Sequence, residues 1–228
     1  MSDKHLSPLL LLMQLSDSAL PVGGFSFSNT LESAVEYGIV DSEESLMVFS
    51  KALLQQSATT DGVAALNAHR AAIKGDYQTI IRCDKALYAR KINAEQRLMS
   101  QRMGRKLAEL CANISGSTLL RRYCDDASAA HTYAVVQGVV FAEYGLTEDE
   151  LFASLCYGTA SMVLNAALRC MRITHLQTQR ILFSLAQHIA PLYGEIAELD
   201  IDNMHSFSLQ IDALSALHEK SAKRLFMN

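Results

Sequence analysis

The 228-residue sequence has no tryptophan and only three prolines, and no stretch of it is rich in proline, glycine and serine. Because linkers between domains have that composition, we expect residues 1–228 to form a single domain. Only 19% of the residues are charged and 50% are hydrophobic, which excludes disorder as the dominant state. The formal net charge is -4, so there is no overall positive field to attract nucleic acid.

The short signatures of common enzymes are also missing. The sequence contains no HExxH, GxSxG, GxGxxG or phosphate-loop pattern, and no two of its seven histidines stand three or four residues apart. An enzyme would therefore need a constellation of residues outside these signatures, and we assign no catalytic residue, no cofactor and no metal site from the sequence. The five cysteines are widely spaced without a CxxC, which is typical of buried thiols in a reducing compartment and indicates a cytoplasmic protein.

One segment, Leu151–Leu168, has no charged residue and equals the shortest membrane-spanning helix in length. Serine, glycine, threonine and asparagine interrupt it, acidic residues precede it, and Arg169 and Arg172 follow it. We interpret it as a core helix and expect no membrane span. The apolar run Leu9–Met13 is too short for the core of a signal peptide.

The pattern of what is present predicts an all-α fold. Apolar residues recur at helical spacing, and runs of alternating β-branched residues are nearly absent. We expect a helical bundle in which two charge-free stretches, Ala127–Ala142 and Leu151–Leu168, form the buried centre and amphipathic helices surround them. The expected amphipathic stripes are Leu46, Phe49, Leu53 and Leu54, and Leu98, Met103, Leu107 and Leu110.

Helix ends are predicted from caps and glycines. Helices should stop at Gly38, Gly75 and Gly145. The pairs Asn29 with Glu32 and Thr147 with Glu150 have the spacing of a capping box. Weaker start signals are Ser42, Asp61, Asp76 and Ser128.

Three segments are not explained by packing alone. The first is a loop with Pro21, Gly23, Gly24 and the aromatic Phe25; the second is the charged segment Glu95–Arg105, which holds a glycine at position 104; the third is the end of the chain. A glycine inside a helix costs about 1 kcal/mol relative to alanine, so Gly104 predicts a close contact with a neighbouring helix or subunit. The third segment, His218–Asn228, places Leu225 and Phe226 where chain ends usually fray.

These three segments, in this order, resemble the UreF family of urease accessory proteins. The resemblance includes Pro21, Gly23, Gly24 and Phe25 in the loop; Glu95, Arg97, Ser100, Met103, Gly104 and Arg105 in the middle; and His218, Glu219, Arg224, Leu225 and Phe226 at the end. The chain departs from the family at Thr30, where glycine is usual, and at Arg172, Thr174, His175 and Thr178. Because the usual Pro and Gly are absent there, we expect the helix to continue through Arg169–Gln179.

The resemblance implies a non-enzymatic, all-α assembly factor that dimerises. Such proteins bind UreD, also called UreH, and together dock the nickel-carrying GTPase UreG onto apo-urease. It further implies that residues 218–228 are a partner-dependent tail and that partner contacts come from Phe25, His218, Glu219, Arg224, Leu225 and Phe226, with Glu95, Arg97 and Arg105 as further candidates. Intramolecular ion pairs explain the last three equally well.

Two other functions stay open. An all-α enzyme or ligand-binding protein would place its site among His131, Tyr133, Tyr157 and Asn165, and a sizeable pocket between them would favour it. His131 is otherwise a core histidine bonded to a backbone carbonyl. A direct nickel chaperone would use histidine or cysteine side chains.

Overall fold

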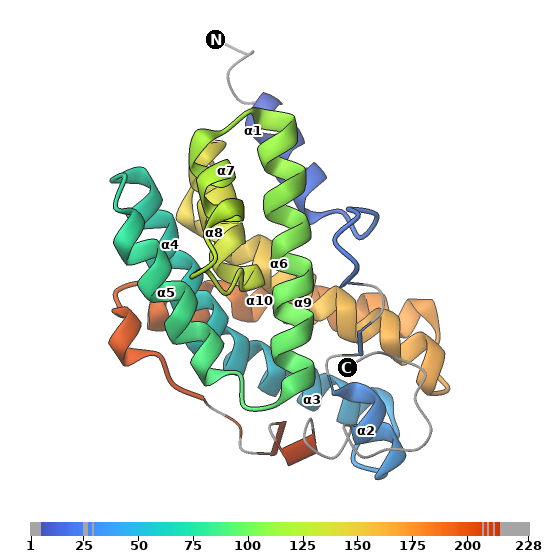
Figure 1. Ribbon diagram of the computed structural model, residues 1–228. Helices are drawn as coiled ribbons and strands as arrows, with labels where there is room; N and C mark the ends of the chain where they lie inside the picture. The colour runs from blue at the N-terminus through green and yellow to red at the C-terminus, as the bar shows by residue number, and fades with distance from the viewer. Residues whose placement is uncertain are drawn as a thin grey trace.

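The computed structural model (Figure 1) describes residues 6–24, 27–28, 30–206, 208, 210–211 and 213–214, and within them every regular element is a helix. The all-α prediction is confirmed. In chain order the elements are α1 (Leu6–Ser16), α2 (Leu31–Glu36), α3 (Glu43–Ser57), a π-helical turn η2 (Ala58–Gly62), α4 (Val63–Ile73), α5 (Tyr77–Arg90), α6 (Ala94–Ser115), α7 (Thr118–Asp125), α8 (Tyr133–Glu143), α9 (Glu148–Cys170), α10 (His175–Ile196) and the 3-10 turn η3 (Ile201–Asn203).

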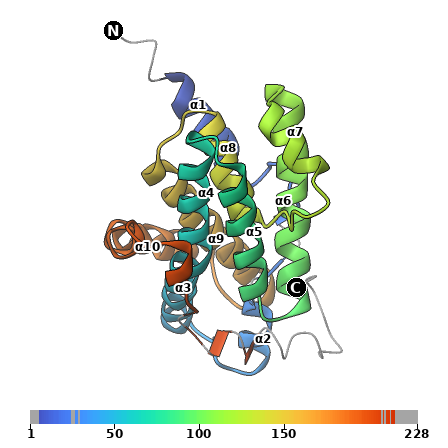
Figure 2. The ribbon, with the colours of Figure 1, turned by 60° about the vertical axis from the view of Figure 1, so that its left-hand side comes forward.

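The centre of the molecule is the pair α4 and α8. In Figures 1 and 2, α4, α5, α6 and α8 run beside one another, while α9 and α10 cross them. Gly138 brings α8 against α4 so closely that an added Cβ would lie 2.4 Å from the carbonyl oxygen of Ala65. Glycine at this position is therefore a packing requirement, because any side chain would force the two helices apart.

The two charge-free stretches differ in their burial. From Ala134 to Phe141 every residue of α8 is buried, as predicted, but the helix begins at Tyr133 and not near Ala127. Helix α9 is long and apolar enough to cross a membrane, yet 56% of its most apolar window is already buried inside the protein. Its other face carries exposed Tyr157, Gly158 and Asn165, so the prediction of a fully central helix holds for only one side of α9.

Several helix ends agree with the caps predicted from the sequence. Thr147 and Glu150 form the expected capping box at the start of α9, and Ser42 and Asp76 accept the predicted backbone bonds at α3 and α5. The three predicted stop glycines, Gly38, Gly75 and Gly145, each follow a helix with φ of +69°. These signals act within a few residues, which is why the sequence alone locates them.

Two other start signals, Asp61 and Ser128, were wrong. Asp61 caps nothing, because α3, η2 and α4 follow one another without a break and Asp61 lies inside η2. Ser128 precedes a loop, and Thr132 occupies the N-cap position of α8 without a side-chain cap bond, because its hydroxyl donates to Asp84. Asn29 lies outside the described residues, and Thr30 occupies the cap position of α2.

The expected helix through Arg169–Gln179 is also absent. Helix α9 ends at Cys170, and Thr174 starts α10 by a capping box with Gln177. The threonine that replaces the family's usual residue therefore creates a helix start where we expected continuity.

Buried Asp84 of α5 fixes the loop that leads into α8. Its carboxylate accepts hydrogen bonds from the backbone N–H groups of Ala130, His131 and Thr132 at 2.7 to 2.9 Å, and from the Thr132 hydroxyl at 2.6 Å. His131 adopts a φ of +59° there, a conformation that is costly for a residue with a side chain. The four bonds to one buried carboxylate explain how the loop keeps this shape.

Candidate functional site

The glycine loop lies beside α6 and α9. Gly23 has a φ of +86°, which only glycine adopts without strain, and an added Cβ at Gly24 would lie 3.2 Å from the methyl of Met103 and 3.6 Å from that of Met162. Thr30, where the family usually has glycine, has a φ of +70°. The position therefore demands the backbone conformation that glycine provides, and threonine takes it at a cost.

Gly104 of α6 lies directly against the loop that Asp84 holds. An added Cβ would lie 2.0 Å from the carbonyl oxygen of His131 and 2.9 Å from the backbone nitrogen of Tyr133. The close contact predicted at this glycine thus exists within the protein, against the loop at His131 and the first residue of helix α8, Tyr133. The stripe predicted along α6 is correct at Met103 and Leu107, but Leu98 is 42% exposed, and the buried face uses the small residues Ser100, Gly104 and Ala108 instead.

The charged residues of α6 have contacts within the chain. Arg97 donates from Nε to the carbonyl oxygen of Lys91 at 2.7 Å and lies over the Tyr88 ring, so it closes the turn between α5 and α6. Arg105 pairs with Glu109 one turn along the exposed side of the helix at 3.0 Å. Glu95 lies in the first turn of α6. A partner contact by Glu95, Arg97 or Arg105 stays a prediction.

The remaining predicted partner residues lie outside the described residues. They are Phe25, His218, Glu219, Arg224, Leu225 and Phe226. The described chain reaches Leu214, which is buried, and Ile211, which lines the cavity described next. Of the loop residues, Pro21 is exposed, and Gly23 and Gly24 lie near α6 as described above.

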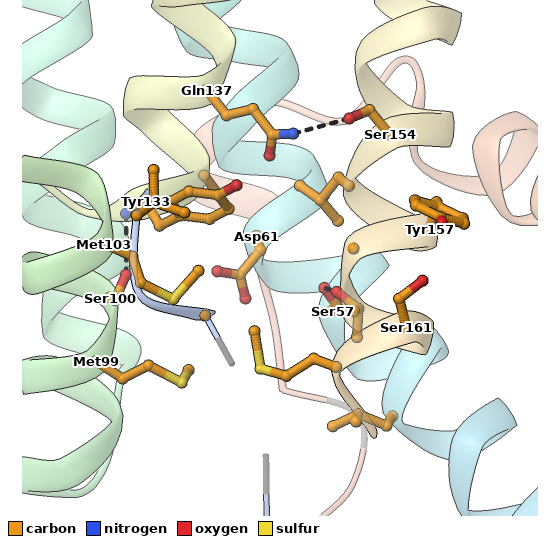
Figure 3. Close-up of a pocket in the computed structure, with 18 of the residues that line it drawn as sticks. Ser57, Asp61, Met99, Ser100, Met103, Tyr133, Gln137, Ser154, Tyr157 and Ser161 are labelled. Atoms are coloured by element: carbon orange, nitrogen blue, oxygen red, sulfur yellow. Dashed lines mark hydrogen bonds between the residues drawn. The ribbon is translucent and has the colours of Figure 1, made fainter. Parts of the chain in front are cut away.

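A cavity of about 190 Å³ opens between the glycine loop, α3 with η2, α6, α8 and α9 (Figure 3). Three of the four residues proposed for a ligand site, Tyr133, Tyr157 and Asn165, line it. The fourth does not: the His131 ring points into the core, where Nε2 lies 2.9 Å from the carbonyl oxygen of Tyr123. The interpretation of His131 as a core histidine is confirmed.

The polar groups of the cavity come from elements far apart in the sequence. Lys91 donates to both carboxylate oxygens of Asp61, at 2.8 and 2.6 Å, across the cavity edge. Gln137 donates from Nε2 to Ser154 Oγ at 3.2 Å, and Ser154 Oγ lies 2.8 Å from Ser16 Oγ. Burial raises the pKa of Tyr133 to about 12, so its phenol stays protonated at neutral pH. Asp61, Gln137 and Ser154 were not predicted as cavity residues. For Gln137 and Ser154 the available signal was that they are polar residues inside the charge-free stretches.

Reactive chemistry is scarce in the part of the chain that the structure describes. That part contains no group of three histidine, cysteine or acidic side chains placed to hold a metal ion. All five cysteines are free thiols, and burial raises the pKa of Cys83 and of Cys156 to about 12. These two thiols are therefore protonated at neutral pH and are poor nucleophiles.

Fold and site together define an all-α protein with a cavity that both polar and apolar side chains line. A family model described as UreF matches residues 40–186. Urease accessory protein UreF 2 of Brucella canis is 44% identical over 230 aligned residues, covering 100% of this chain and 95% of that protein. Urease accessory protein UreF of Yersinia enterocolitica is 42% identical, covering 97% of this chain and 99% of that protein. The chain belongs to the UreF family.

Proposed function

We propose that this chain is a cytoplasmic, non-enzymatic scaffold for urease maturation. Together with UreD (UreH) it recruits the nickel-carrying GTPase UreG to apo-urease, where nickel is inserted. The observation that carries the proposal is the match, over the whole chain, to relatives named urease accessory proteins. The contacts of the described polar residues support it, because the buried carboxylate Asp84 and the buried imidazole His131 serve to hold a loop.

In this proposal the tail, residues 218–228, is the partner-dependent element. Arg224 supplies planar guanidinium donors, and Leu225 and Phe226 supply apolar area, which together suit a segment that a partner fixes in place. Once fixed by UreD, such a segment completes the surface for UreG, so binding of the first partner raises the affinity for the second. Phe25 of the glycine loop offers an aromatic ring for the tail of a second copy in a homodimer.

The test is a reconstitution with purified UreD and UreG. The full chain should form a stable complex with UreD and then retain UreG, whereas Arg224→Ala or deletion of residues 223–228 should retain UreD and lose UreG. Arg180→Ala is the matched control, because Arg180 is an exposed arginine of α10 outside the predicted contacts. Light scattering on the eluted species measures the dimer.

Retention of UreG by the truncated chain would remove the tail from the proposal. The scaffold proposal itself would fail if cells lacking this chain produced fully nickel-loaded urease. Calorimetric titration with nickel separates the scaffold from a direct nickel chaperone, because a scaffold gives no tight stoichiometric binding.

A further inference from the structure

Gln137 has one hydrogen-bonding group that the described chain does not satisfy. Its side chain is 3% exposed; Nε2 donates to Ser154, but Oε1 has no hydrogen-bond partner among the described residues. Figure 3 shows the amide oxygen turned toward the cavity, on the side of Tyr133 and Asp61. Leaving a buried acceptor without a donor is costly, so a native protein that keeps one usually has a ligand or water to fill it.

The charged groups around the cavity are already neutralised or bonded. Asp61 is paired through both oxygens with Lys91, and Arg90 donates from Nε to the carbonyl oxygen of Met204 at 2.9 Å. Ser100 Oγ accepts from the backbone N–H of Tyr133 at 3.1 Å. The buried neutral amide oxygen of Gln137 is thus an acceptor available to a ligand, and it suits an uncharged molecule with an N–H donor better than an ion.

The remaining wall is apolar and adaptable. The thioethers of Met99, Met103 and Met162 line the cavity together with Leu15 and Leu155. Methionine side chains adjust to irregular shapes, so this wall accepts a small apolar group without a fixed outline. The volume, about 190 Å³, accommodates one small organic molecule.

The backbone of the cavity is also unusual. Thr60 and Asp61 belong to the π-helical turn η2, where the Thr60 hydroxyl donates to the carbonyl oxygen of Gln56 at 2.7 Å. Single π-helical turns are rare within α-helical segments and occur frequently at functional sites. Here the turn inserts between α3 and α4 at the cavity wall, where Figure 3 shows the Asp61 carboxylate facing the open space.

We propose that this cavity binds a small uncharged molecule that has a carboxamide or similar N–H donor and a short apolar group. The donor bonds to Oε1 of Gln137, and the apolar group lies against the methionines. The site is separate from the scaffold function, which requires no small ligand, and it gives the chain a second binding capacity.

The experiment is an NMR titration of the full chain with propionamide and with methyl acetate, which has the same number of heavy atoms but no N–H. Propionamide should shift the side-chain amide signals of Gln137 and the methyl signals of Met103 and Met162. Methyl acetate should bind about tenfold more weakly, the factor expected for one hydrogen bond. Gln137→Met should lower propionamide affinity by a similar factor, while Gln179→Met, at an exposed position of α10, should leave it unchanged.

Equal shifts from the amide and the ester, equal affinity in Gln137→Met, or no shift from either probe would each overturn the proposal. If Gln137→Met does not fold, as judged by circular dichroism, the contrast between amide and ester in the unaltered chain decides. None of these outcomes depends on UreD or UreG, so the scaffold proposal is tested separately.

Discussion

Helices α8 and α9 come from the two charge-free stretches of the chain, yet they occupy different environments. Helix α8 is enclosed by α4, α5, α6 and α9, whereas α9 buries one face and turns Tyr157, Gly158 and Asn165 outward beside the cavity. A lack of charge therefore identifies a helix near the core, but it does not say how many of its sides are covered. The polar residues indicate how many sides of each helix are covered: α8 has one buried glutamine, while α9 has several small polar side chains on its open face.

The largest difference between the two helices should come from their aromatic residues. Phe141 of α8 is fully buried and Tyr157 of α9 is 42% exposed. We expect Phe141→Ala to lower the free energy of unfolding by about 3 to 5 kcal/mol, because it leaves a cavity in close-packed core. Tyr157→Ala should change it by less than about 0.5 kcal/mol. Urea unfolding measures both, and equal losses would contradict the difference in burial.

A glycine-to-alanine substitution provides the same comparison for backbone contact. Gly138→Ala in α8 should lower the free energy of unfolding by about 3 kcal/mol, because the new methyl meets the carbonyl oxygen of Ala65. In Gly158→Ala of α9 the new methyl has no neighbouring atom within 4 Å. This substitution should raise the free energy of unfolding by about 0.5 to 1 kcal/mol, because alanine has the higher helix propensity. The melting temperatures of the two variants should therefore shift in opposite directions. If both rose, α8 and α4 would be able to move apart and accept the new methyl.

The starts of the two helices differ as well. The loop before α8 depends on buried Asp84, and Asp84→Asn should lower the free energy of unfolding by about 2 kcal/mol, because an amide cannot accept from all its present donors. The start of α9 depends on exposed Thr147, and Thr147→Ala should cost about 1 kcal/mol. Chemical denaturation of both variants tests this order, and a larger loss at Thr147 would reverse it.

The smallest predicted effect is on the pH dependence of stability at alkaline pH. Burial raises the pKa of Cys156, on the buried face of α9, to about 12, while an unfolded thiol ionises near pH 9. Because the folded pKa is the higher one, this contribution to stability is complete below about pH 9 and is lost as the pH rises toward about 12. Unfolding between pH 8 and pH 11 should depend less steeply on pH in Cys156→Ala than in the unaltered chain.

Cys170→Ala is the control, because burial raises the pKa of Cys170 only to about 11. Its effect on the pH dependence should be similar up to about pH 10 and smaller above it, because the folded-state thiol of Cys170 begins to ionise first. Equal slopes in all three proteins would mean that ionisation of Cys156 is not linked to unfolding.

Local chemistry was predictable from the sequence and long-range placement was not. The Thr147 and Glu150 box and the stop at Gly145 were predicted correctly, because each involves residues within one turn. Asp61 was wrongly predicted to start a helix, because an aspartate can stand at a helix start or inside a π-helical turn. Only the contact of Asp61 with Lys91, which is distant in sequence, distinguishes the two positions. The sequence indicated a possible pocket at Tyr133, Tyr157 and Asn165, but it did not indicate that Gln137 is the buried acceptor in that pocket.

The sequence by itself determined the all-α class and the UreF family, since helical periodicity and the motif residues are properties of the chain read in order. Only the tertiary structure decided that Gly104 and Gly138 are close contacts, that α8 is enclosed while α9 is open on one side, and that Gln137 faces a cavity. Each of these depends on which distant segments contact one another. Those contacts are determined by the packing of whole helices and not by spacing along the chain.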